Sequence, residues 1–487
     1  MVSNQLKNQH LRWRAGFGPT GADLSALATI SSGSLFRQIW QNSMKTPAML
    51  NGMDEETREM IAEMGDMQGM KRKDLSPDQK KDFGKASYRC TRNLNLAWMN
   101  EMVDSPAQLR EKMSLFWHGH FATRVDNIFF TQSLLDIIRR NALGNFGDLL
   151  HALSKSGAMI NFLNSNQNKK DHPNENFARE VMELFTLGRG NYTETDVKEA
   201  ARAFTGWGAD LQGNFVFRSN QHDTRDKTVL GRSGNFDGDD VLNILLEQKQ
   251  TARFVTRKIY RFLVNEQPDE AKVDWLAGRF YKNNYEIKPL MEDIFLGDWF
   301  YEEKNIGSRI KSPVELIAGI RRMIPMKIAN EESQLQVQAV LGQTLFFPPN
   351  VAGWPGGMNW IDSSSLMFRL RLPEIIYASG EIDLTAKPDD DIQMGRRELM
   401  EYQISMGELH KYAAQMIRAE LFWPDYLKRF EQTKKEDLLS EIGKTILQVP
   451  TGIKESTIKS FMDVSGRESF IKTATIQLMS TPEYQLC

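Results

Sequence analysis

Cysteine, long apolar runs and an excess of charge of either sign are scarce in this sequence. Only Cys90 and Cys487 occur in 487 residues, so neither a disulfide framework nor a thiolate zinc cluster is available. Nowhere do 18 apolar residues follow one another, and we therefore expect no membrane span. The first residues lack the apolar core of a signal peptide. These features favour the cytoplasm, or the cell envelope if a leader has been removed.

The charges almost cancel. Sixty-one basic and 63 acidic residues give a net charge of -2, which argues against a general nucleic-acid-binding protein because such proteins need an excess of positive charge. Hydrophobic residues make up 41% of the chain, enough to bury a core and to exclude a wholly disordered chain. The expected partner is a small molecule or a saccharide.

Helix signals dominate the chain. Ser76, Ser105 and Ser312 each provide a capping hydroxyl, followed by proline at the first helical position and glutamine or glutamate at the third. Apolar residues at helical spacing predict further helices at 128–143, 174–187, 194–205, 239–247, 251–264, 272–282, 333–345, 405–421, 436–448 and 467–480. Strand signals are confined to 213–217 and 228–230, which are predicted to pair as a short ribbon. The fold is predicted to be mainly α, a large multi-helix domain with at most a short β-ribbon.

Composition divides the chain into three zones. Residues 1–104 form a helical N-terminal region with a charged, Met-rich segment at 45–82 that is predicted to be exposed helix or linker. Residues 105–370 form a central helical core domain that carries the candidate site. Residues 371–487 form a C-terminal helical region, with a candidate linker at 388–391.

The first candidate site is the histidine pair in the segment FWHGHF (116–121). If the chain leaves the helix at the intervening glycine and becomes extended, His118 and His120 point to the same side and form a compact pair of metal ligands. In a continuous helix the two side chains lie about 200° apart and cannot share an ion. The alternative is a pair of helix-end histidines packed among aromatic rings.

The second candidate site is the predicted helix at 174–187, NENFAREVMELFTL. Glu175 and Glu180 are candidate catalytic carboxylates, and Arg179 is a candidate substrate-binding residue that could also pair with Glu175. A carboxylate stripe along a helix also occurs on ordinary solvated faces, where acidic residues stabilise the helix N-terminus.

The third and fourth candidates lie in predicted loops. His222 is a candidate metal ligand, Asp223 a general base and Lys227 an anion-binding residue, although a turn rich in Asp and Gly has a purely structural explanation as well. Trp354 lies in the Pro- and Gly-rich segment 346–361, which forms either a stacking platform for a sugar ring or an anchor onto the core.

Long ordered motifs resemble those of a bacterial family catalogued as domain of unknown function eighteen-hundred. The matching segments are RAGFG (14–18), FWHGHFATR (116–124), the stretch at 174–207, RIKSPVE (309–315) and NVAGWPGG (350–357). The resemblance implies a shared fold over most of the chain. It implies no reaction, because none is established for the family.

Two functions of different classes are therefore open. The first is a divalent-metal-dependent hydrolase or oxidoreductase. In it, His118 and His120 bind zinc, manganese or iron, and Glu175, Glu180 or His222 completes the ligand set. The second is a non-catalytic helical scaffold or a carbohydrate-binding protein, in which the aromatic loop binds the partner and the polar stripe is a buried hydrogen-bond network.

Overall fold

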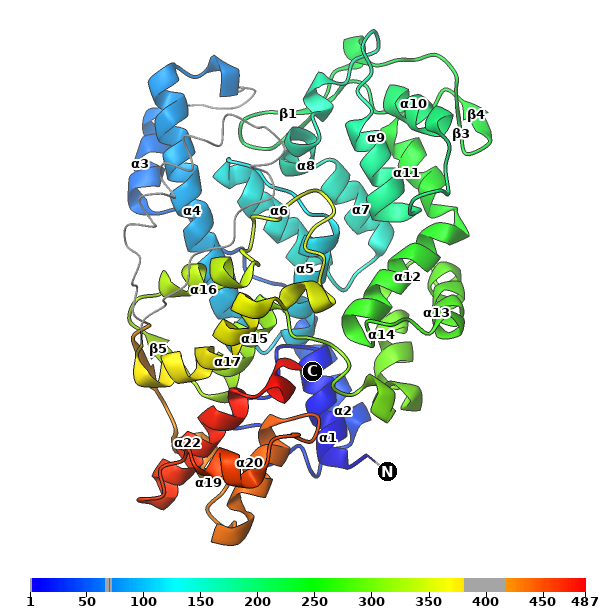
Figure 1. Cartoon of the computed structure of the whole chain (residues 1–487). Coiled ribbons are helices and arrows are strands. Elements are labelled where there is room, and N and C mark those ends of the chain that lie inside the picture. The colour runs from blue at the N-terminus through cyan, green and yellow to red at the C-terminus, as the bar shows by residue number, and fades with distance from the viewer. Residues whose placement is uncertain (1, 66–69, 71, 381–416) are drawn as a thin grey trace.

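We describe the protein from a computed structural model, in which residues 2–65, 70, 72–380 and 417–487 are described. Helices make up most of it, as the sequence predicts (Figure 1). The helices of the N-terminal half are α1 (Asn4–Arg14), α2 (Ser32–Ser43), α3 (Glu55–Glu63), α4 (Pro77–Asp104), α5 (Gln108–His120), α6 (Ile128–Asn141), α7 (Phe146–Ser154), α8 (Gly157–Phe162), α9 (Asn176–Glu180), α10 (Glu194–Ala203) and α11 (Gly238–Leu246).

The C-terminal half continues the helical pattern. Its helices are α12 (Lys249–Leu263), α13 (Glu270–Lys282), α14 (Ile287–Phe295), α15 (Pro313–Met323), α16 (Ser333–Leu341), α17 (Ser363–Ala378), α19 (Pro424–Lys428), α20 (Leu438–Ile446), α21 (Glu455–Lys459) and α22 (Arg467–Met479). The predicted helix at 405–421 lies mostly outside the described residues, and its last part is a strand instead. The candidate linker at 388–391 also lies outside them.

Three small antiparallel ribbons are the sheets of the described residues. The ribbons pair β1 (Trp207–Ala209) with β2 (Phe215–Phe217), β3 (Lys227–Val229) with β4 (Arg232–Gly234), and β5 (Met326–Ile328) with β6 (Ala419–Leu421). The prediction that 213–217 pairs with 228–230 is wrong. Each segment forms its own hairpin with a neighbour, because a short turn costs less entropy to close than a longer loop.

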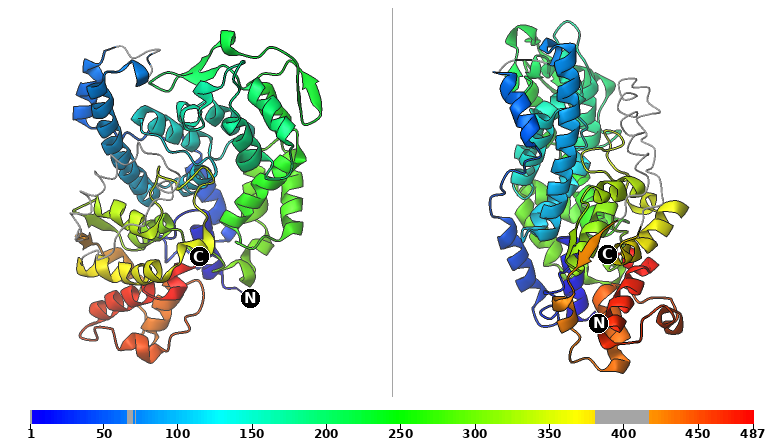
Figure 2. Two further views of the ribbon diagram at one scale, coloured as in Figure 1. Left: turned by 45° about the horizontal axis from the view of Figure 1, so that its top comes forward. Right: turned by 90° about the vertical axis from the view of Figure 1, so that its left-hand side faces the viewer.

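One large hydrophobic cluster extends through the described molecule, and a small second cluster consists of Leu75, Phe83 and Leu211. The large cluster contains residues of all three zones, from Leu11 through Trp117 and Ile320 to Tyr484. Figure 1 shows α1 and α2 next to the C-terminal helices, with α5 and α6 in the centre, and the side view of Figure 2 shows a narrower molecule along which α4 runs. No helix in the described ranges combines the length and the apolar character needed to cross a bilayer.

Two of the three predicted caps are confirmed. Ser76 and Ser312 form capping boxes with Gln79 and Glu315, and proline occupies the first turn of α4 and α15. The third prediction is wrong, since Ser105 ends α4 and α5 begins at Gln108 without a side-chain cap. The Gln108 amide instead donates back to the carbonyls of Met102 and Ser105, at 3.0 and 2.7 Å, and its oxygen accepts from the Phe17 amide.

A buried ion pair connects α5 to α15. Lys112 and Glu315 are separated by 203 residues in sequence, and both side chains are almost fully buried. The Glu315 carboxylate also accepts the Ser312 amide at 2.7 Å, so the capping box and the ion pair share one residue. The Lys112 ammonium donates to the Trp13 carbonyl at 3.1 Å, which adds the end of α1 to the same contact.

Glu315→Gln tests this contact. We expect it to lower the free energy of unfolding by about 3–5 kcal/mol, because Lys112 keeps its buried charge and loses its carboxylate partner. Urea or thermal unfolding measures the loss. Glu292→Gln is the matched control, since Glu292 forms an exposed pair with Lys288 and its loss costs less than about 1 kcal/mol. Similar losses in both variants would contradict a structural role for the buried pair.

Candidate functional site

The histidine pair lies inside a helix. Of the two conformations that the sequence leaves open at Gly119, the structure has the helical one, because α5 continues to His120. Burial explains why the glycine does not end the helix: almost every α5 residue up to His118 is inaccessible to solvent, and this packing outweighs the about 1 kcal/mol helix penalty of a glycine. The two imidazoles therefore point in different directions.

His118 is enclosed by aromatic rings. Its Nε2 accepts a hydrogen bond from the Phe346 amide at 3.0 Å, and its ring centroid lies 5.3 Å from that of Trp98 and 5.5 Å from that of Trp354. Burial lowers the pKa of His118 to about 3, so the imidazole is neutral at physiological pH. This environment matches the alternative of a histidine packed among aromatic rings.

His120 contacts the end of the segment 174–187, which we call the NENFARE segment after its first residues. Its Nε2 lies 3.1 Å from the carbonyl oxygen of Phe185, and its Nδ1 lies 3.2 Å from the ammonium of Lys258. Since the ammonium can only donate, Nδ1 accepts and Nε2 carries the proton that is donated to Phe185. Burial, and then the positive charge of Lys258, lower the pKa of His120 well below its ordinary value.

The NENFARE segment is an α-helix that changes into a π-helix. α9 ends at Glu180, and residues Val181–Thr186 (η3) form the π-helical turn. The carbonyls at its end accept hydrogen bonds from other elements: Leu184 from Lys258 at 3.0 Å, and Leu187 from the Gln250 amide at 2.9 Å. A positive charge at a helix C-terminus interacts favourably with the helix dipole. Lys258 and His120 thus stabilise an unusual helix end.

The predicted carboxylates of this helix do not converge. Arg179 pairs with Glu175 at 3.0 Å and with Glu194 of α10 at 2.7 Å, as the four-residue spacing of the first pair predicts. Glu180 forms no ion pair within 4.0 Å among the described residues, and burial followed by repulsion from Glu183 raises its pKa against the opposing charge of Arg179. The Glu183 carboxylate in turn accepts the Tyr192 hydroxyl.

The His222–Lys227 loop is held in place by hydrogen bonds within the loop and to Thr205 and Arg202. The His222 Nδ1 lies 2.9 Å from the Thr205 carbonyl oxygen. Asp223 is buried and bonds to Arg202 at 2.9 Å and to Arg225 at 2.5 Å, and these bonds, Arg225 first, hold its pKa far below its ordinary range. A carboxylate that stays ionised this firmly is a poor general base. Lys227 donates to the Arg225 carbonyl at 2.9 Å, and burial lowers its pKa.

Trp354 lies over the end of α5. Its contact with His118 is accompanied by a close approach of Gly353 to the Gly119 carbonyl, where a Cβ atom would clash. Gly353 also has a positive φ of 78°, so glycine is required here for two reasons. The aromatic segment is therefore anchored onto the core, one of the two alternatives that the sequence leaves open.

The structure does not bring the predicted ligands together. Among residues 2–65, 70, 72–380 and 417–487, no group of three or more His, Cys, Asp or Glu side chains is arranged to hold a metal ion. His118 faces an aromatic shell, His120 faces the π-helix, and His222 faces Thr205. Binding of zinc, manganese or iron stays an untested prediction, without a shared ligand set for the three histidines.

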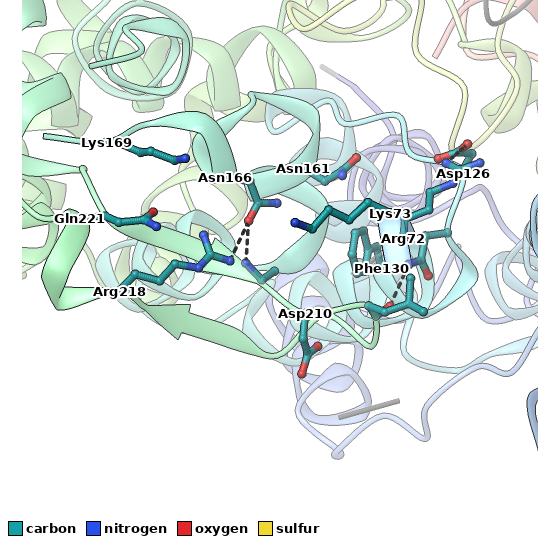
Figure 3. Close-up of a pocket in the computed structure, with 13 residues that line it drawn as sticks. Arg72, Lys73, Asp126, Phe130, Asn161, Asn166, Lys169, Asp210, Arg218 and Gln221 are labelled. Atoms are coloured by element: carbon teal, nitrogen blue, oxygen red, sulfur yellow. Dashed lines mark hydrogen bonds and ion pairs between the residues drawn. The ribbon is translucent and has the colours of Figure 1, made fainter. Parts of the chain in front are cut away.

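A polar cavity of about 350 Å³ opens elsewhere, beside the first ribbon (Figure 3). Four segments contribute to it: η1 (Arg72–Asp74), the start of α6, the region of α8 and η2 (Ser165–Gln167), and β1–β2 with η4 (Ser219–Gln221). Its lining residues are Arg72, Lys73, Asp126, Asn127, Phe130, Asn161, Asn166, Lys169, Ala209, Asp210, Leu211, Arg218 and Gln221. We call this site the polar cavity.

Positive charge predominates in the polar cavity. Arg72 pairs with Asp126, whereas no described carboxylate pairs with Lys73, Lys169 or Arg218. The Asp210 carboxylate accepts hydrogen bonds within its own loop, at 3.0 Å from the Gln212 amide and 2.9 Å from the Asn214 amide. Three cationic side chains are thus available to a ligand.

Asn166 organises the centre of the cavity. Its side-chain oxygen accepts from the Ala209 amide at 3.1 Å and from the Arg218 guanidinium at 3.4 Å. Figure 3 shows Lys73, Lys169 and Arg218 directed toward Asn166 from three sides. The guanidinium crosses the β1 backbone so closely that a Cβ atom at Gly208 would clash with it. The ribbon thereby fixes the position of Arg218.

None of the residues of this cavity was a candidate in the sequence. They come from four separate segments, and although most of them are polar, they share no single periodic pattern. Two predicted elements contribute: the helix at 128–143 contains Phe130, and the strand segment 213–217 contributes β2, which positions Arg218 directly after it.

The described residues form a mainly helical protein with a polar, net-positive cavity beside its first ribbon. The chain belongs to the family described as "Protein of unknown function (DUF1800)", whose sequence profile matches residues 10–486. This match confirms the resemblance carried by the motifs. Neither a curated protein nor a solved structure matches the chain.

The contact between Lys258 and His120 gives a pH-dependent prediction. Burial, and then Arg261, lower the pKa of Lys258 to about 8, so competitive acetylation followed by mass spectrometry is expected to give half-maximal reactivity near pH 8. Exposed Lys169 is the internal reference. From pH 8 to the ordinary value of about 10.5, the unfolded chain binds more protons at this position, so its contribution to the free energy of unfolding rises with pH. A reactivity profile identical to that of Lys169 would contradict this.

Proposed function

We propose that the protein binds a small acidic saccharide, a hydroxyl-rich molecule with one carboxylate, in the polar cavity. This proposal refines the carbohydrate-binding alternative that the sequence suggests and moves the site from the aromatic segment to the first ribbon. The observation that carries it is that, among the described residues, four cationic and four amide side chains line one cavity together with two carboxylates.

Charge supports an anionic ligand. The carboxylate of Asp126 is paired with Arg72, and that of Asp210 is already bonded to its own loop. A ligand carboxylate between Lys73, Lys169 and Arg218 would gain charge-assisted hydrogen bonds, which are stronger than neutral ones. The guanidinium of Arg218 is suited to a planar carboxylate because both groups form two parallel hydrogen bonds.

The remaining lining supports a saccharide. The amides of Asn161 and Gln221 each offer donors and an acceptor, as ring hydroxyls require. Phe130 adds an apolar surface against which the face of a sugar ring can pack. A volume of about 350 Å³ lies in the range of small-molecule sites.

Binding is favoured over catalysis at this position. The described lining has no histidine, cysteine or serine, and its two carboxylates already have partners: Asp126 pairs with Arg72, and Asp210 accepts from the Asn214 amide. The metal-dependent hydrolase or oxidoreductase stays a prediction without support from the arrangement of its proposed ligands.

Calorimetric titration with D-glucuronate, D-glucose and inorganic phosphate tests the proposal. We expect glucuronate to bind, glucose to bind at least about tenfold more weakly and phosphate weakly or not at all, because only glucuronate combines hydroxyls with a carboxylate. Lys169→Gln and Arg218→Gln should each weaken glucuronate binding about tenfold and reduce the preference over glucose.

Arg232→Gln is the matched control. Arg232 lies on the neighbouring ribbon and pairs at 2.5 Å with Glu247, and it does not line the cavity. Its substitution should leave the affinity unchanged. Phosphate binding as tight as that of glucuronate would replace the saccharide by a simple anion, and no binding of any of the three would favour the non-catalytic scaffold.

A further inference from the structure

Five cationic side chains are buried together where α1, α5, α15 and α17 meet the last residues of the chain. Arg14, Lys112 and Arg369 are fully inaccessible to solvent, Lys311 is 1% exposed and Arg309 is 9% exposed. Each interacts electrostatically with Glu315, which places all five around one point. We call these five residues the buried cationic cluster.

The negative charge near the cluster is smaller than the positive charge of its five members. Glu315 is the one described carboxylate within 4.0 Å of any member, and it approaches Lys112 and Arg309. An anionic group of Cys487 acts on Arg14, Lys112, Lys311 and Arg369 at longer range. Five cations thus face two anionic groups. Burial lowers the pKa of Lys311 to about 7, so even with a neutral Lys311 the positive charge exceeds the negative charge.

Several donors of the cluster have no acceptor among the described residues. Arg14 donates through Nη2 to the Asn305 carbonyl at 2.9 Å and to the Ser308 hydroxyl at 3.0 Å, whereas its Nε and Nη1 are buried without a partner. Nη1 of Arg369 also has no hydrogen-bond partner, whereas Nη1 of Arg309 lies 3.5 Å from the Glu315 carboxylate. A guanidinium does not lose its proton near neutral pH, so these groups cannot avoid the penalty by becoming neutral.

Elsewhere in this protein a buried guanidinium is fully paired. Arg139, 1% exposed, donates to both oxygens of Glu111, to Glu101 and to the Ala48 carbonyl. Nε of Arg321, outside the cluster, also lacks a partner, so the cluster is distinguished by gathering unpartnered nitrogens of both Arg14 and Arg369 in one place. Burying an unpaired charge costs several kcal/mol.

We propose that the buried cationic cluster binds a small inorganic anion of the halide type, chloride under ordinary conditions. A halide accepts hydrogen bonds from several directions and supplies negative charge, so it satisfies the unpartnered guanidinium donors and reduces the charge excess together. A water molecule would satisfy donors but would leave the excess positive charge. The anion would connect Arg14 of α1 with Arg309 and with Arg369 of α17, segments from opposite ends of the chain.

Exchange of the anion tests the proposal on the full chain. The protein is dialysed into sodium gluconate and titrated with sodium bromide at constant ionic strength while its melting temperature is recorded. We expect a saturable rise of about 2–4 °C, the size that follows from ligand binding to the folded state only. Crystals grown in bromide should give an anomalous scattering peak within hydrogen-bond distance of Arg14 or Arg369.

Variants separate site binding from general salt effects. Arg369→Gln should abolish the saturable rise and the anomalous peak, whereas Arg139→Gln should lower the melting temperature and leave the bromide response intact. If Arg369→Gln does not fold, the wild-type measurements decide alone. A wild-type protein with no saturable response and no anomalous peak at the cluster overturns the proposal, as does an equal response in both variants.

Discussion

The carboxylate of Glu315 is the group on which the centre of this structure depends. One of its oxygens accepts the amide of Ser312 and thereby starts α15, and the other faces the ammonium of Lys112 from α5. A buried ion pair contributes little net stability compared with apolar packing, but it permits few alternative arrangements because either charge alone is costly. The pair therefore constrains how the N-terminal helices and the last third of the chain dock.

Local signals in the sequence predict well where helices form. They predict poorly which tertiary contacts the residues of those helices make. The capping boxes at Ser76 and Ser312 depend only on residues within one helical turn, and both form. Ser105 carries the same pattern but ends α4, because Gln108 bonds back across the junction and to Phe17. The conformation of the histidine pair is decided in the same way: packing around α5, which local sequence does not encode, lets the helix continue to His120. Family membership, in contrast, follows directly from long ordered motifs.

The polar cavity shows that sequence motifs do not identify a site assembled from distant segments. The polar residues of the motifs at 116–124 and 174–207 serve mostly as structural partners: His120 binds the Phe185 carbonyl, and Arg179 joins α9 to α10. The polar cavity, in contrast, is assembled from segments separated by up to about 150 positions, Lys73 to Gln221, with no periodic pattern. Spacing along the chain can indicate which residues share a helix face, but not which loops meet. The predicted elements place Phe130 on a helix and Arg218 after a strand, but not next to one another.

The π-helical turn at Val181–Thr186 has a consequence for how this region tolerates change in length. A π-turn is equivalent to one residue added to an α-helix. Deleting one residue there would remove the extra residue and restore regular α-helical winding, with the helix after it keeping its orientation. The carbonyls of Leu184 and Phe185, which lie within the π-turn, would then change position relative to Lys258 and His120. The segment can thus accept substitutions of similar shape more readily than a one-residue deletion. The π-helical turn depends on the number of residues in the segment as well as on which residues they are.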